Sequence, residues 1–289
     1  MASAALKNTY SFVRYRIIAL RYLGKAMRTA RRLTDRRGTV AGRQTQEAAE
    51  VARTGFAHGP TLPADTVSAM REIYVPRGDA VVPRDRGHPF ANLFTPTDVD
   101  ADNPVFRHAL SPDIMAIVHD YFDGDYQFET VQVLHSFPTS GPLRDSQKWH
   151  RDYGDAKSLH FITYLNDVED DAGGPFGFVD RETTKRVRSS PIIRRIDDDR
   201  FREEIGPEGE IQKFYGKRGS TLIVDPANCY HFGSRCKTPR LAIFVTFNTL
   251  TPYEPLKSAF DNQREKVVAE AAKVRPDLDL AYLERIFGL

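Results

Sequence analysis

Residues 241–249 read LAIFVTFNT, a run of β-branched and aromatic residues that strongly favours a β-strand. Four further stretches share this character, at 127–137 (QFETVQVLHSF), 158–165 (SLHFITYL), 176–179 and 220–224. Turn-rich segments such as DDAGGP separate the strands, and we expect no helices between them. Short strands in this arrangement predict an antiparallel β-sandwich or barrel over about 126–250.

Segments with helical signals flank the predicted β core. One helix is expected over 65–74. A second begins at Ser-Pro-Asp, residues 111–113, with Ser as the N-cap, Pro at the first helical position and an acid in the first turn. Residues 257–287 are again helical, with a break at Pro276. The fold class is therefore mainly β with flanking helices, an α+β arrangement.

Two stretches predict irregular structure between these elements. Residues 38–62 contain several glycines and read as a connector. Residues 76–104 are rich in Pro, Gly, Asp and Arg, and we expect loops there.

The charge of the chain is unevenly distributed. The 289 residues include 41 Lys and Arg against 39 Asp and Glu, a net charge of +2. Residues 1–43 hold eleven of the basic side chains and one acid, which leaves a net charge of −8 on the remainder. A uniformly basic nucleic-acid-binding protein is therefore not indicated. We divide the chain into a basic extension, 1–43, and one domain, 44–289.

Residues 10–34 of the extension predict an amphipathic helix with a basic stripe. Such a helix suits peripheral contact with an anionic membrane surface or an acidic partner, and the segment also resembles an organellar transit peptide. An extension without mechanistic consequence is equally compatible with the sequence. No apolar run is long enough to span a membrane, no secretory signal is evident, and two cysteines do not make a disulfide scaffold. A cytoplasmic protein is the expectation, with the membrane surface as an alternative.

The chemistry-bearing residues follow the first predicted core strand. His150 and Asp152 form an H-x-D motif, and residues two apart on an extended backbone face the same side. His231 follows the strand GSTLIVD at 219–225 and offers a third ligand. Two His and one carboxylate with open positions make the facial triad of non-haem Fe(II) sites. Arg240, nine residues later, suits pairing with the distal carboxylate of a 2-oxo acid.

A zinc site is the alternative to an Fe(II) site. Cys229, His231 and Cys236 lie close together in sequence, but a fourth ligand is not evident and the H-x-D motif would have no role.

Several motifs occur together in a characteristic order. They are WHRD at 149–152, YLND at 164–167, AGGPF at 172–176, GSTLIVDP at 219–226, YHFGS at 230–234, and Pro239-Arg240. With these motifs the chain resembles the phytanoyl-CoA dioxygenase-like branch of the Fe(II)/2-oxoglutarate-dependent oxygenases over roughly residues 50–255. The resemblance implies a double-stranded β-helix core, also called a jelly roll or cupin-like fold.

The resemblance also implies an activity: hydroxylation of a small-molecule or conjugated metabolite, with Fe(II) as cofactor, 2-oxoglutarate as cosubstrate, O2 as oxidant, and succinate and CO2 as products. His150, Asp152 and His231 would be the catalytic iron ligands, and Arg240 would anchor 2-oxoglutarate. Tyr164 and Gln132 would also contact the cosubstrate, while Arg235 is a rival anchor because the spacing from His231 to Arg240 is short for the family.

The chain departs from the family pattern at two places. Arg151 stands where Gln or another polar residue is usual, and the family's Gly-Ser-His motif has no counterpart near 179–181. Two other function classes therefore stay open: a catalytically inactive cupin-like binding protein, and an accessory protein held to a membrane or polymer by its basic helix. A small molecule is the expected partner, and basic side chains near the motif would favour an anionic one unless they are only solvated surface charge: Arg144, Lys148, Arg151 and Arg181.

Overall fold

The computed structural model describes residues 45–83, 88–138, 140–188, 194–252, 260 and 262–288. The predicted helix over 10–34 lies outside the described residues. Within the described part of the chain, no helix is both long enough and apolar enough to cross a membrane.

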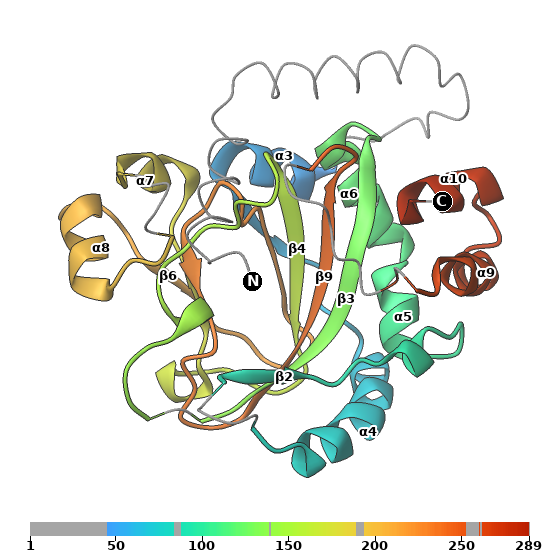
Figure 1. The fold of residues 1–289 in the computed structure, drawn as a ribbon, viewed down its shortest axis with the longest axis horizontal. Coiled ribbons are helices and arrows are strands. Elements are labelled where there is room, and N and C mark those ends of the chain that lie inside the picture. The colour runs from blue at the N-terminus through green and yellow to red at the C-terminus, as the bar shows by residue number, and fades with distance from the viewer. Residues whose placement is uncertain are drawn as a thin grey trace, which may run out of the picture.

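A six-stranded antiparallel sheet forms the centre of the fold (Figure 1). In spatial order its strands are β1 (Phe56–Gly59), β7 (Thr221–Val224), β4 (Ser158–Tyr164), β9 (Arg240–Thr249), β3 (Tyr126–Ser136) and β2 (Phe90–Asn92). The stretch LAIFVTFNT lies in β9, between β3 and β4, so the strongest strand signal occupies a central position. The strands expected at 127–137, 158–165, 220–224 and 241–249 are all present.

Alternation along the strands divides the sheet into two chemically different faces. On β9, Leu241, Ile243, Val245 and Phe247 point to an outer face and belong to the large hydrophobic core. Helices cover that core: α3 (Gln46–Thr54), α4 (Ala64–Ala80), α5 (Pro104–Ala109), α6 (Pro112–Phe122), α9 (Arg264–Val274) and α10 (Leu280–Phe287). The N-cap at Ser111 and the break between α9 and α10 are as expected.

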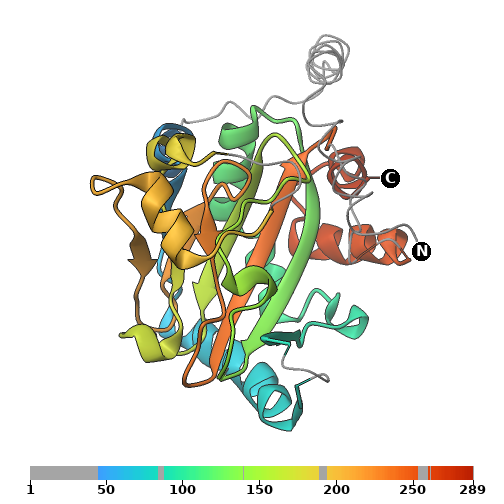
Figure 2. The same cartoon turned by 60° about the vertical axis from the view of Figure 1, so that its left-hand side comes forward.

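A second, three-stranded sheet faces the inner side of the first (Figure 2). It consists of β6 (Gln212–Phe214), β5 (Phe176–Phe178) and β8 (His231–Phe232), all antiparallel. Ile162, Leu222 and Ala242 of the large sheet pack against Phe176 and Phe214 of the small one. Two facing antiparallel sheets are the architecture of a jelly roll, as expected. Two helices lie beside the small sheet, α7 (Arg181–Arg186) and α8 (Asp198–Ile205).

Three expectations about local structure are wrong. The connector expected over 38–62 contains α3 and β1, because β1 completes the large sheet by pairing with β7. The loops expected over 76–104 contain the end of α4, strand β2 and the 3-10 turn Pro96–Asp98. Helix α4 continues through Pro76 because Val67, Met70 and Tyr74 anchor it in the core. Helices α7 and α8 also interrupt the β region, where we expected none.

Asp225 holds the end of β7 in place from a fully buried position. Its carboxylate accepts hydrogen bonds from the Tyr121 hydroxyl at 2.5 Å, Arg181 Nη2 at 3.1 Å and Asn228 Nδ2 at 2.7 Å. The backbone N–H of Ser158 on β4 donates to the same group at 3.3 Å. One carboxylate therefore joins helices α6 and α7, two strands and the turn that leads to His231.

Replacing Asp225 by Ala should lower the free energy of unfolding by about 3–5 kcal/mol, because the half-buried Arg181 would lose its counter-ion and the buried donors of Tyr121 and Ser158 would lose their acceptor. Urea denaturation of the metal-free protein measures this. Asp167→Ala, which removes an exposed ion pair with Arg218, is the matched control and should change stability little. Equal losses in both variants would contradict the role given to Asp225.

Candidate metal centre

A short backbone pairing brings the H-x-D motif to His231. His150 and His231 form an isolated antiparallel bridge, in which His150 N–H donates to the His231 carbonyl at 3.0 Å and His231 N–H donates to the His150 carbonyl at 2.9 Å. Asp152 N–H donates to the Pro226 carbonyl at 2.9 Å, which extends the contact by two residues. Residues 81 positions apart are thereby placed side by side on extended backbone.

The three side chains converge on one point. Asp152 Oδ1 lies 4.0 Å from His150 Nε2 and 3.9 Å from His231 Nε2. Ligand atoms of the three residues all lie within 4.8 Å of one another, as donors around a single ion do. The imidazole rings are 4.2 Å apart between centroids and inclined by 52°, so neither ring blocks the space between them.

Hydrogen bonds on the far side of each imidazole select the tautomer that a metal needs. His150 Nδ1 lies 2.8 Å from the Lys148 carbonyl, and His231 Nδ1 lies 3.1 Å from the Cys229 carbonyl. A carbonyl only accepts, so each Nδ1 carries the hydrogen and each Nε2 presents a lone pair toward Asp152. Backbone carbonyls that orient ligand imidazoles in this way are a common feature of protein metal sites.

The protonation states also suit a cation. Burial lowers the pKa of both His150 and His231, so both rings are neutral near pH 7. Burial acts to raise the pKa of Asp152, but the imidazoles of His231, His160 and His150 outweigh it and hold that pKa below its usual value. Two neutral nitrogens and one carboxylate are the donor set of a non-haem Fe(II) facial triad, so these residues fit that metal.

Arg240 is buried at the start of β9 without an acidic partner in the described part of the chain. Its Nη1 donates to the Gly174 carbonyl, and its Nη2 lies 3.3 Å from Ser136 Oγ. Its Nε is buried with no hydrogen-bond partner among the described residues. A buried guanidinium costs free energy unless an anion balances it, so this geometry fits the distal carboxylate of 2-oxoglutarate.

The rival anchor Arg235 lies in a different setting. Its guanidinium forms a bidentate ion pair with Asp198, at 2.8 and 2.9 Å, and donates to the Gln147 carbonyl at 2.7 Å. It also covers the ring of Phe232 at 3.6 Å. These contacts tie Arg235 to α8 and leave Arg240 as the guanidinium on the inner face of the sheet.

Gln132 and Tyr164 are the other two residues expected to contact the cosubstrate. Gln132 of β3 is half-buried. It lies on the inner face, because its partner on β9 is Phe244, which also pairs with Ile162 of the core between the sheets. Tyr164 is buried on the same face, but its hydroxyl donates its only hydrogen to the Phe214 carbonyl at 2.9 Å. The hydroxyl thus joins β4 to β6 in this structure, and its contact with 2-oxoglutarate stays a prediction.

A third histidine, His160, lies close to the centre, which the sequence did not predict. His160 Nε2 lies 3.8 Å from Asp152 Oδ2, the carboxylate oxygen turned away from the other two imidazoles. Alternation with Ile162 and Tyr164 already places it on the inner face of β4, but only the fold brings it to Asp152. Desolvation lowers its pKa to about 4, so this half-buried ring is a neutral neighbour of the centre.

The geometry does not support a zinc site formed by Cys229, His231 and Cys236. Cys229 and Cys236 are buried free thiols, and Cys229 packs in the core between the sheets. Among the described residues, the cluster of His, Cys, Asp and Glu with metal-site geometry is His150, Asp152 and His231.

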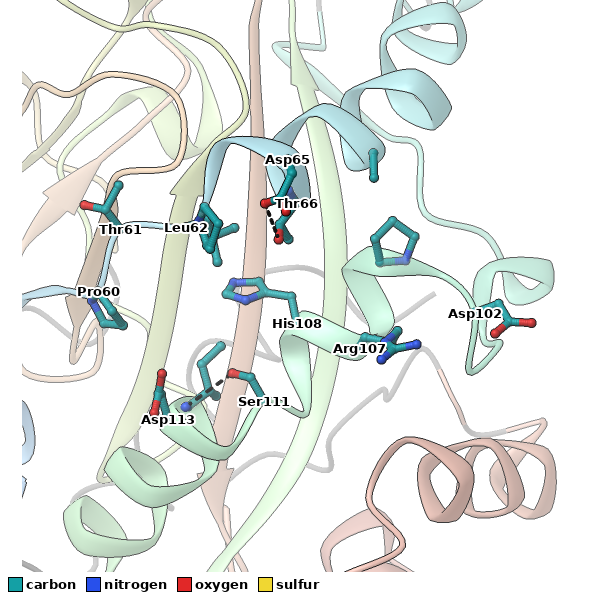
Figure 3. Close-up of a pocket in the computed structure, with 14 residues that line it drawn as sticks. Pro60, Thr61, Leu62, Asp65, Thr66, Asp102, Arg107, His108, Ser111 and Asp113 are labelled. Atoms are coloured by element: carbon teal, nitrogen blue, oxygen red, sulfur yellow. Dashed lines mark hydrogen bonds between the residues drawn. The ribbon is translucent and has the colours of Figure 1, made fainter.

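A separate pocket of about 600 Å³ lies in the helical layer, between the segment before α4 and helices α5 and α6 (Figure 3). His108 points into the space beside Leu62 and Thr66. None of the candidate metal ligands lines this pocket, so it is distinct from the centre described above.

No protein-family model matches the chain, and no curated protein sequence matches it. Solved structures do. SnoN, a non-haem α-ketoglutarate-dependent epimerase from nogalamycin biosynthesis, is 18% identical over 74% of this chain and 87% of its own, with a TM-score of 0.50.

Two further structures resemble the chain slightly more in shape. EctD from S. alaskensis is 16% identical over 77% of this chain and 85% of its own, and SnoK, a non-haem α-ketoglutarate-dependent carbocyclase from nogalamycin biosynthesis, is 15% identical over 75% and 94%. Both have a TM-score of 0.52. At these identities the likeness establishes the fold: the chain has the jelly-roll core of these enzymes.

Proposed function

We propose that the protein is a non-haem Fe(II)- and 2-oxoglutarate-dependent dioxygenase that oxidises a small molecule, and that it belongs with the phytanoyl-CoA dioxygenase-like enzymes. The observation that carries the proposal is that two sites face the space between the two sheets. His150, Asp152 and His231 converge with their lone pairs inward, and Arg240 is buried with no acidic partner among the described residues. A metal site alone would not need the buried guanidinium, and an anion site alone would not need the triad.

Each side chain has a defined task in this proposal. The two imidazoles and the carboxylate hold Fe(II) through three positions and leave the others open. Arg240 orients 2-oxoglutarate through its distal carboxylate, with Gln132 on the neighbouring strand. Bound Fe(II) would supply coordination positions for 2-oxoglutarate and O2, and the redox change that couples their reaction. Close to Arg240, the buried side chains between the sheets exclude water.

Known structures with this fold are in keeping with the proposal. One EctD structure contains 2-oxoglutarate and 5-hydroxyectoine, and SnoN was solved with Fe3+ and α-ketoglutarate. The departure at Arg151 is also accommodated, since its guanidinium lies 5.1 and 5.3 Å from the rings of Tyr153 and Tyr230. Contact of residues 10–34 with a membrane surface stays a prediction.

The activity is tested by succinate formation from 2-oxoglutarate, in the presence of Fe(II) and O2, across a panel of small metabolites. Asp152→Ala should abolish substrate-stimulated succinate release, because it removes the one anionic ligand. Asp197→Ala, an exposed carboxylate paired with Lys148, is the control and should keep the activity. A wild-type protein that binds iron but consumes no 2-oxoglutarate would instead be an inactive binding protein.

Metal binding should stabilise the fold. Fe(II) under anaerobic conditions, at about 100 times its Kd, should add about 2.7 kcal/mol to the free energy of unfolding, and a chelator should reverse the rise in Tm. His231→Ala should lose this response, because it removes one of three ligands. His88→Ala, an exposed histidine on the path to β2, should keep it. An equal metal response in both variants would place the ion elsewhere.

Replacing Arg240 by Lys should raise the Kd for 2-oxoglutarate at least tenfold, since Lys keeps the charge but cannot form the bidentate contact. Calorimetric titration of 2-oxoglutarate into the metal-loaded protein measures this. The matched variant Arg235→Lys should bind 2-oxoglutarate as the wild type does. The reverse pattern would assign the anchor to Arg235.

A further inference from the structure

Asp152 is the candidate ligand whose side chain is held least firmly. Backbone carbonyls orient the imidazoles of His150 and His231 through their Nδ1 atoms. The carboxylate of Asp152 accepts no hydrogen bond from the described part of the chain, and its side chain is 42% exposed. Ligand carboxylates in protein metal sites are generally hydrogen-bonded in turn. The centre therefore lacks, at Asp152, the orienting contact that its two imidazoles have.

His160 lies where such a contact would be made. Its Nε2 is 3.8 Å from Asp152 Oδ2, whereas the Nε2 atoms of His150 and His231 lie closest to Oδ1. The ring of His160 does not belong to the group whose ligand atoms all lie within 4.8 Å of one another. His160 is therefore a neighbour of a ligand, on the carboxylate oxygen that the other two imidazoles do not approach.

The large sheet holds the His160 ring in place. On β4, His160 stands in a row with Val224 of β7 and Thr246 of β9. The ring of Phe244 meets it edge-on, with the centroids 6.4 Å apart and an angle of 80° between the planes. The side chain of His160 is 16% exposed, against 42% for Asp152. The imidazole is thus the fixed partner of the pair, and the carboxylate is the group free to turn.

The chemistry of the two groups favours a hydrogen bond from His160 to Asp152. A neutral imidazole has one N–H, and an ionised carboxylate only accepts, so the facing Nε2 is the atom expected to carry the hydrogen. The 3.8 Å separation is about 1 Å longer than a direct N–H···O hydrogen bond. Asp152 lies outside the strands and helices, so a small turn of its side chain closes this gap.

We propose that His160 is a positioning residue that donates a hydrogen bond from Nε2 to Asp152 Oδ2 and thereby keeps Oδ1 directed at the metal ion. The inference rests on the proposed oxygenase function. With this contact each of the three ligands has an orienting partner, which is main chain for the imidazoles and strand β4 for the carboxylate. The hydrogen bond offsets the conformational entropy lost when Asp152 is ordered around the ion.

The test is anaerobic calorimetric titration of Fe(II) into the wild type and three variants. His160→Leu removes the donor and should raise the Kd for Fe(II) about 10–100-fold, as loss of a contact to a metal ligand typically does. His160→Gln should restore an affinity near that of the wild type, because its amide nitrogen lies as many bonds from Cα as Nε2 does. Thr246→Val, which removes a hydroxyl from the same row of the sheet, is the matched control and should leave the Kd unchanged.

This order of affinities separates hydrogen bonding from packing. The site of the ring lies beside the apolar side chains of Val224 and Phe244, so a packing role would be served better by Leu than by Gln. Because Leu leaves no buried polar group without a partner, the metal-free His160→Leu protein should keep the wild-type Tm.

Two outcomes would overturn the inference: a wild-type Kd for Fe(II) in His160→Leu, or an equal loss of affinity in His160→Leu and His160→Gln. In both cases, wild-type protein that binds Fe(II) and 2-oxoglutarate would leave the oxygenase proposal standing. Failure of the wild type to bind 2-oxoglutarate with Fe(II) would instead remove the proposed function itself.

Discussion

The pair of backbone hydrogen bonds between His150 and His231 is the constraint on which the candidate centre depends. It joins two extended segments 81 residues apart and presents both imidazoles on one side. The Nδ1 contacts to the Lys148 and Cys229 carbonyls then fix the ring orientation without any further side chain. The ligands are therefore held by main chain, which is rigid and tolerant of changes in the surrounding sequence.

The fold supports this pairing because the two faces of the large sheet carry different side chains. The outer face of β9 and β4 is apolar and packs under the helices. The inner face runs from buried Arg240 to half-buried His160, with the centre between the two sheets. Buried Asp225 links the turn before His231 to helix α6 and to β4. The hydrogen bonds of Asp225 that stabilise this turn therefore also position His231, the third ligand.

Much of this arrangement could be predicted from sequence, for physical reasons that differ by element. The long core strands are strongly β-branched and aromatic, so their local signal agrees with their position. Strands β1, β2, β6 and β8 have four residues or fewer, and each is fixed by pairing with a strand that is distant in sequence. Helix α4 passes through Pro76 because tertiary packing outweighs a local penalty. Such effects are not visible in a local pattern.

The same division holds at the site. The spacing of H-x-D and the later His predicts three ligands that the structure brings together. The contact of His160 with Asp152 could not be assigned from sequence, because it depends on strand alternation meeting a separate loop. Tyr164 was expected to donate to the cosubstrate, yet its hydroxyl is bonded to Phe214. A hydroxyl's partner is decided by the fold.

We propose that the space between the two sheets binds Fe(II) and 2-oxoglutarate together. Anaerobic titration of the protein with Fe(II) and 2-oxoglutarate, followed by visible absorption, tests it most directly. We expect a charge-transfer band that requires protein, metal and 2-oxoglutarate together and saturates at one equivalent of each. Tight binding of Fe(II) without any band on addition of 2-oxoglutarate would contradict it.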